Sequence, residues 1–138
     1  MLLPLVTLAS GTTPDQVKQE ATYSDQFLES SHIPQPVIFY EAPLWTYDSC
    51  VEFAKWRTGK QGVSWGAAGE IEPTTTQPEI GGFGLTSEGP GHLFVITEIK
   101  DGWIKTDEAN LISGERTSRW IKVDDTDIRG FLPRNWGS

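Results

Sequence analysis

The 138-residue chain contains one cysteine, Cys50, and two histidines, His32 and His92. A cysteine attacks as the thiolate, and a protonated histidine or a helix N-terminus lowers the pKa of its thiol below about 8.5. A third group has to orient the imidazole. Glu108 and Asn110 lie two residues apart on a predicted strand, so their side chains share one face. These residue types are typical of nucleophilic attack on a carbonyl carbon followed by acyl transfer.

The sequence around the cysteine, "YDSCVEFAKWRTG", predicts a helix that begins beside the thiol. Ser49 and Glu52 form a capping box, which places Cys50 at the first helical position, and Gly59 is placed to end the helix. The free N–H groups of a first turn favour a thiolate and can hold the oxyanion that develops on a substrate carbonyl. The alternative is a small buried residue that closes the turn, which is a common place for a single cysteine.

His92 opens a predicted central strand, 92–99, directly after the flexible sequence "SEGPG". This strand is apolar on both faces, which predicts that it is covered on both sides. The alternative for His92 is a strand-end histidine whose hydrogen bonds are satisfied within the fold. His32 lies in "SSHIPQP", where we expect a surface or capping role.

The hairpin "KDGW" decides whether His92 and Glu108 share a face of the sheet. A two-residue Asp-Gly turn pairs the lysine with the tryptophan and leaves the two side chains on opposite faces. A three-residue loop with a left-handed glycine shifts the register by one residue and brings them to the same face. A catalytic site therefore predicts the three-residue loop, or else a second bulge between Phe94 and Ala109.

Residues 1–44 form a predicted lead-in to a single domain at 45–138. Segment 1–9 reads as a strand or packed arm, because it is too short to span a membrane and no basic residue precedes it as in a signal peptide. Thr13 and Pro14 predict the start of a helix with one apolar stripe, and residues 37–40 read as extended. The stripe of that helix consists of Val17, Ala21, Ser24 and Leu28.

The second half of the chain changes to the pattern of an antiparallel sheet after a long surface connection at 62–78. Together with the helix at Cys50, it predicts an α+β domain of about four to six strands. The predicted strands are 83–86, 92–99, 103–110 and 117–123.

The chain has 19 acidic and 11 basic residues and a formal charge of −8. This balance disfavours binding to nucleic acid and to anionic membranes. A lone cysteine cannot form an internal disulfide, and the spacing of Cys and His does not match a zinc site. Asp124, Asp125 and Asp127 lack the pattern of an EF-hand and are expected to form a solvated turn. We therefore expect no metal and no other cofactor.

Five segments resemble, in order, the CHAP family of cysteine- and histidine-dependent amidohydrolases and peptidases. They are "DSCVEFAKWRTG", "WGAAGEI", "PEIGGFGLTSEGPGHLFVITEI", "DGWIKTDEAN" and "IRGF", from about residue 47 to 131. The resemblance implies a papain-like α+β fold, with Cys50 as nucleophile and His92 as general base and acid. Glu108 would orient the imidazole, and Asn110 would be a further polar group beside it.

The resemblance has departures as well as matches. Many family members have Gln or Asn before the cysteine and an Asp ahead of the first strand, where this chain has Ser49 and Gly82. The acidic cluster that binds calcium in some members is also missing, which agrees with the expectation of no metal. For substrate contact, Trp65 and Trp120 are the aromatic candidates to line a groove, with core packing as the alternative for both.

The resemblance implies hydrolysis of amide bonds in the stem peptide or cross-bridge of bacterial peptidoglycan, by an endopeptidase or an N-acetylmuramoyl-L-alanine amidase. Such a phage or bacterial lysin would act outside the cell at the wall, be released on lysis, or belong to a virion. One alternative is an assembly protein of a phage particle or surface complex, with the lead-in bound to a protein partner. A further alternative is a cysteine peptidase or deamidase that acts on proteins.

Overall fold

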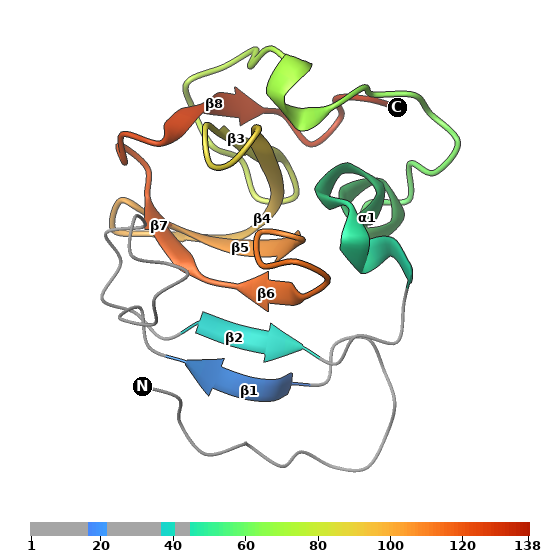
Figure 1. The fold of residues 1–138 in the computed structure, drawn as a ribbon. Coiled ribbons are helices and arrows are strands. Elements are labelled where there is room, and N and C mark those ends of the chain that lie inside the picture. The colour runs from blue at the N-terminus through green and yellow to red at the C-terminus, as the bar shows by residue number, and fades with distance from the viewer. Residues whose placement is uncertain (1–16, 22–36, 41–44) are drawn as a thin grey trace.

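The computed structural model describes residues 17–21, 37–40 and 45–138. Eight strands form one antiparallel sheet in the spatial order β1-β2-β6-β5-β4-β3-β8, and β7 pairs with β5 (Figure 1). Both described pieces of the lead-in belong to this sheet, since β1 pairs with β2 and β2 with β6. The strands are β1 (Val17–Ala21), β2 (Val37–Tyr40), β3 (Phe83–Thr86), β4 (His92–Lys100), β5 (Trp103–Ala109), β6 (Arg116–Ser118), β7 (Trp120–Lys122) and β8 (Ile128–Leu132).

The protein is therefore largely β, and the prediction of a papain-like α+β fold with a helical lead-in is wrong. The described residues contain a single α-helix, α1 (Cys50–Arg57), and short 3₁₀ turns at Trp45–Asp48 and Ala68–Glu70. Residues 17–21, expected in a helix, form β1, because pairing with β2 overrides the local helix signals upstream. The other lead-in expectations, at 1–16, 22–36 and 41–44, lie outside the described residues. No helix in the described ranges is long and apolar enough to cross a membrane.

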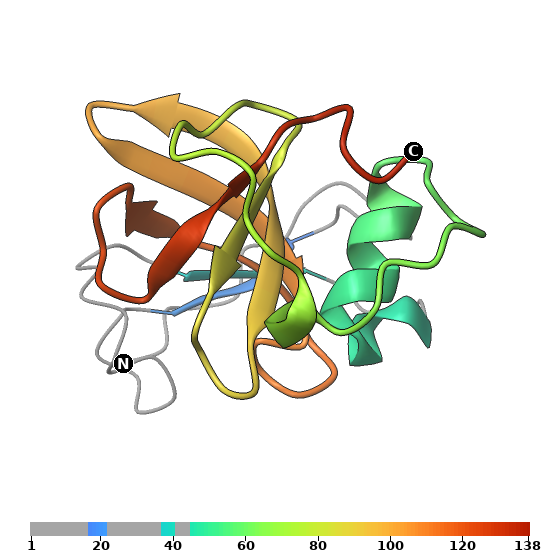
Figure 2. The same cartoon turned by 90° about the horizontal axis from the view of Figure 1, so that it is seen from above.

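Helix α1 forms as its sequence predicts. The Ser49 hydroxyl accepts the N–H of Glu52 at 3.1 Å. The helix ends at Arg57 with Thr58 as its C-cap, followed by Gly59 with φ of +73°. The Glu52 carboxylate does not complete the box but accepts a bond from Lys55 at 3.1 Å. Figure 2 shows α1 against one side of the curved sheet. This capping fixes the start of the helix, and with it the position of Cys50.

Strand β4 is covered on both faces, which confirms the prediction from its apolar pattern. Leu93 and Val95 belong to the core under α1, while Phe94 and Ile96 belong to a second core on the opposite face. The first core also contains Val51 and Ala54 of α1, Ala68, Ile71, Phe83, Leu85 and Leu132, and the second contains Ile104, Ile121 and Phe131.

The hairpin between β4 and β5 has the two-residue turn, so the prediction of a three-residue loop is wrong. Asp101 and Gly102 both have positive φ, +53° and +82°, which matches the twist of the strands they join. The alternative expectation, a β-bulge between Phe94 and Ala109, is confirmed, and this bulge supplies the register shift. Ile96 pairs with Thr106 but Glu98 pairs with Lys105, so one residue of β4, Thr97, is extra. This bulge brings residues 92 and 108 to the same face.

Candidate active site

Cys50 lies at the first position of α1, half-buried, with its thiol hydrogen-bonded to the side chain of His92. Burial opposes ionisation of the thiol most strongly. The bond to His92, its positive charge and the backbone N–H groups of Leu93 and Val51 outweigh burial and hold the pKa of Cys50 below its ordinary value of 9.0. The site therefore favours a thiolate.

His92 lies at the first position of β4 and is 4% exposed. Its Nε2 lies 2.8 Å from Oε1 of Glu108, which leaves Nδ1 as the ring nitrogen for the thiol. Burial disfavours the protonated ring, but the hydrogen bonds to Cys50 and Glu108 and their negative charges raise the pKa of His92 to about 9. The lowered pKa of Cys50 and the raised pKa of His92 both favour the thiolate–imidazolium form of the pair.

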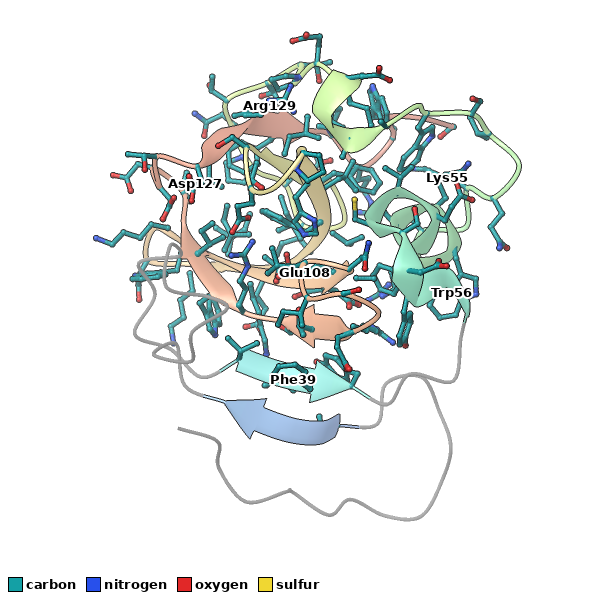
Figure 3. The ribbon with its side chains drawn as sticks, viewed as in Figure 1. Phe39, Lys55, Trp56, Glu108, Asp127 and Arg129 are labelled. Atoms are coloured by element: carbon teal, nitrogen blue, oxygen red, sulfur yellow. The ribbon has the colours of Figure 1, made fainter. Side chains whose placement is uncertain are left out.

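Glu108, on β5, is completely buried, and its label lies near the centre of the molecule in Figure 3. Burial raises the pKa of its carboxyl, but the charge of Arg119, the bond and charge of His92 and the hydroxyl of Thr106 together lower it to about 2. Thr106 donates its hydroxyl to Oε2, and Arg119 Nε donates to the same oxygen at 3.0 Å. Glu108 is consequently ionised and fixed in orientation beside the ring.

Arg119 and Glu88 complete the network, and neither was predicted from the sequence as a site residue. The guanidinium of Arg119 is 1% exposed and lies between two carboxylates, donating through Nη1 to Glu88 Oε2 at 2.8 Å as well as to Glu108. Glu88 is in turn held by the hydroxyl of Thr86 at 2.8 Å. The network therefore runs from β3 through Arg119 to the thiol on α1.

A local break between β6 and β7 positions Arg119. The expected strand 117–123 is two strands, because residue 119 exchanges bonds with Thr106: its carbonyl accepts the N–H of Thr106 at 2.9 Å and its own N–H donates to the Thr106 hydroxyl at 3.0 Å. In the alternating pattern of 117–123, Arg119 shares the parity of Ile121 and Val123. A charged residue at an inward position was the signal that could have identified it.

Asn110 lies at the rim of the site. It is exposed with φ of +64°, and its Oδ1 accepts the N–H of Gly114 at 2.9 Å, which closes the turn between β5 and β6. The polar groups beside the His92–Glu108 pair are those of Thr106 and Arg119, which contact Glu108. Asn110 thus shapes the turn at the rim.

A cleft of about 320 Å³ opens at Cys50. One wall is the start of α1, and the facing wall is the segment 66–69 with Pro90 and Gly91. The complete lining is Asp48, Ser49, Cys50, Val51, Glu52, Gly66, Ala67, Ala68, Gly69, Pro90, Gly91 and Asn110. Small side chains make most of the facing wall, so an extended peptide can approach the thiol closely.

Replacing Gly91 with alanine is expected to unfold the facing wall. Gly91 has φ of +109°, and a Cβ there would lie 2.4 Å from the Cα of Gly69, so backbone strain and a backbone clash combine. We expect a loss of about 2 kcal/mol or more in the free energy of unfolding, measured in urea. Gly89→Ala is the matched control, because its φ is also positive, +56°, but a Cβ would meet nothing within 4 Å. Equal losses for both variants would refute a role for the close contact.

Neither candidate tryptophan lines the cleft. Trp65 packs edge to face on Trp136, with ring centroids 4.8 Å apart, and its Nε1 donates to the carbonyl of Gly137 at 2.9 Å. Trp120 packs against the second core, with Lys105 Nζ 5.9 Å from its ring centroid. Both indoles therefore have the alternative role, core packing. His32 lies outside the described residues.

The ion pair predicts how the reactivity of Cys50 depends on pH. A thiol of pKa about 9 is only about 1% ionised at pH 7, and the lowered pKa of Cys50 raises its thiolate fraction above this. Alkylation by iodoacetamide at pH 7 should therefore be at least about tenfold slower in His92→Ala than in the natural chain. Equal alkylation rates with and without His92 would contradict the ion pair.

Any turnover should fall above about pH 9, where the imidazolium of His92 loses its proton.

The arrangement provides a nucleophile, a proton donor and acceptor, and a buried carboxylate that orients it, at the mouth of an open cleft. These are the parts that attack on a carbonyl carbon requires. Comparisons of the chain with family models, with curated proteins and with solved structures found no match.

Proposed function

We propose that the protein is a cysteine-dependent amidohydrolase that cleaves amide bonds in the peptide part of bacterial peptidoglycan. One observation carries the reaction type: the thiol of Cys50, the ring of His92 and the carboxylate of Glu108 form a hydrogen-bonded chain that ends at a cleft. The substrate class rests on the resemblance of five ordered segments to the CHAP family. These segments contain the three residues named above.

In the proposed reaction the Cys50 thiolate attacks the amide carbonyl carbon. The C–N bond breaks as His92 gives its proton to the leaving amine, and a thioester remains on the sulfur. The neutral ring then takes a proton from water, whose oxygen displaces the sulfur and releases the carboxylic acid. Glu108 stays ionised throughout and keeps Nδ1 directed at the thiol.

Two further features support this chemistry. The N-terminus of α1 opens on the cleft. The N–H groups of Val51 and Glu52 already bond to the thiol and to Ser49, so the N–H of Cys50 itself is the first-turn donor for a developing oxyanion. The facing wall is mainly glycine and alanine, which admits a peptide backbone. The protein would act at the cell wall, from outside or after release on lysis.

Digestion of purified cell walls tests the proposal. We expect soluble fragments with new amino termini or free muramic acid carboxyls, which mass spectrometry distinguishes and which identify the bond. The Cys50→Ala chain is the single-residue control. Walls that stay intact while Cys50 is readily alkylated would leave a reactive thiol without this substrate and would refute the proposed function.

A further inference from the structure

A second pocket, of about 330 Å³, lies at the C-terminal end of α1 and is lined by three cationic side chains. Arg57 is the last residue of α1, Lys60 follows in the next loop, and Arg134 comes after β8. The chain has 11 basic against 19 acidic residues, so three cations around one pocket run against its overall charge. The remaining lining residues are Thr58, Ile80, Gly81, Val95, Ile96 and Thr97.

The charge of Arg57 is only partly neutralised. Its Nε lies 2.8 Å from Oδ2 of Asp107, and its side chain is 40% exposed. The same carboxylate accepts two bonds from the buried guanidinium of Arg116, at 2.9 and 2.7 Å. One negative charge is therefore shared by two arginines, and the pocket side of Arg57 keeps net positive charge.

Lys60 and Arg134 form a pair of like charges. The ammonium of Lys60 donates to a neutral group, the backbone carbonyl of Arg134, at 2.5 Å. Burial and the charge of the Arg134 guanidinium both lower the pKa of Lys60. The neighbouring carboxylate, Glu79, accepts the backbone N–H of Arg134 at 2.6 Å. An anion between the two cations would relieve their repulsion.

We propose that this pocket binds a phosphate group. The oxygens of a tetrahedral phosphate point in several directions, so they can accept bonds from donors on three separate segments, whereas a planar carboxylate is satisfied by one guanidinium. Ile80, which is 54% exposed at the pocket, offers apolar contact to whatever carries the phosphate. The carrier is either a soluble phosphate ester or a polymer of phosphodiesters. The pocket lies about 10 Å along α1 from Cys50 and does not require the proposed hydrolysis.

Calorimetric titration at low salt tests the pocket. It uses the full chain with Cys50→Ala, so that no reaction accompanies binding, and three probes: inorganic phosphate, glycerol 3-phosphate and poly(glycerol phosphate). Lys60→Gln and Arg134→Gln should each weaken binding about tenfold, the loss of one charge-assisted bond. Lys100→Gln is the matched control, because it removes the same charge from an exposed lysine outside the lining and should change affinity less than about twofold.

Each outcome is decisive. Binding that depends on Lys60 and Arg134 but not on Lys100 supports the pocket, and the preferred probe then identifies the carrier. Arg134 is exposed, so its variant is expected to fold even if the Lys60 variant does not. Absence of saturable binding to all three probes, or equal weakening by Lys100→Gln, overturns the proposal. Because the titrated protein lacks the thiol, failure here is distinct from failure of the proposed hydrolysis.

Discussion

Replacing Cys50 with alanine is expected to abolish release of fragments from cell walls. In the proposed reaction the thiolate forms the bond to the carbonyl carbon and the other groups of the site act through it, so turnover should fall by roughly 10⁴-fold or more. Mass spectrometry of digested walls measures the loss. Cys50→Ser should be almost as inactive, because the site lowers the pKa of a thiol and a hydroxyl remains protonated.

The fold should survive both substitutions. His92 keeps its bond to Glu108 when the thiol is absent, so we expect the free energy of unfolding to change by about 1 kcal/mol at most. Thermal unfolding of the natural chain and the two variants provides this control. Fragment release that persists in Cys50→Ala would assign the reaction to another nucleophile.

Replacing Arg119 with methionine is expected to be the most destabilising change in the site. The guanidinium is 1% exposed and bonds to Glu108 and Glu88, so its removal leaves the buried carboxylate of Glu108 and the partly buried one of Glu88 without their common cation. Breaking a buried ion pair on one side costs about 3–5 kcal/mol. Urea unfolding at pH 7 measures this loss.

Arg57→Met provides a matched control for Arg119→Met. Its guanidinium is 40% exposed, and Asp107 stays paired with Arg116, so we expect a loss below about 1 kcal/mol. Arg119→Lys should be intermediate, because an ammonium keeps the charge but cannot reach both carboxylates with a planar fork. Similar losses for the two methionine variants would show that the buried network is not what stabilises this region.

The sequence predicts local structure better than long-range pairing. Helix α1 is predicted because the signals for its start lie within four residues, and the Ser49 hydroxyl caps it as expected. The Asp-Gly sequence itself favours the two-residue turn that forms, and the three-residue loop was expected only for the sake of the site. The predicted helix at Val17 fails because that segment pairs with β2, twenty residues away in the chain. Tertiary pairing of this kind leaves no local signal.

The same limit applies to the site. Cys50, His92 and Glu108 could be selected by residue type and position, and the structure brings these three together. Arg119 lies between β6 and β7, and Glu88 lies in the loop after β3. Their bonds to each other depend on the break between β6 and β7. Charge at an inward position indicates that a partner exists but does not identify it.

The bulge at Thr97 makes the number of residues between His92 and Glu108 a requirement of the proposed catalytic site. Fifteen residues separate His92 from Glu108. Deletion of one residue within β4 would place the Glu108 carboxylate on the opposite face of the sheet from His92, although both residues would still be present. Such a chain would still match a search for the motif residues. Among related sequences, the number of residues between the histidine and the glutamate, in addition to their identity, would therefore indicate whether the two side chains can meet.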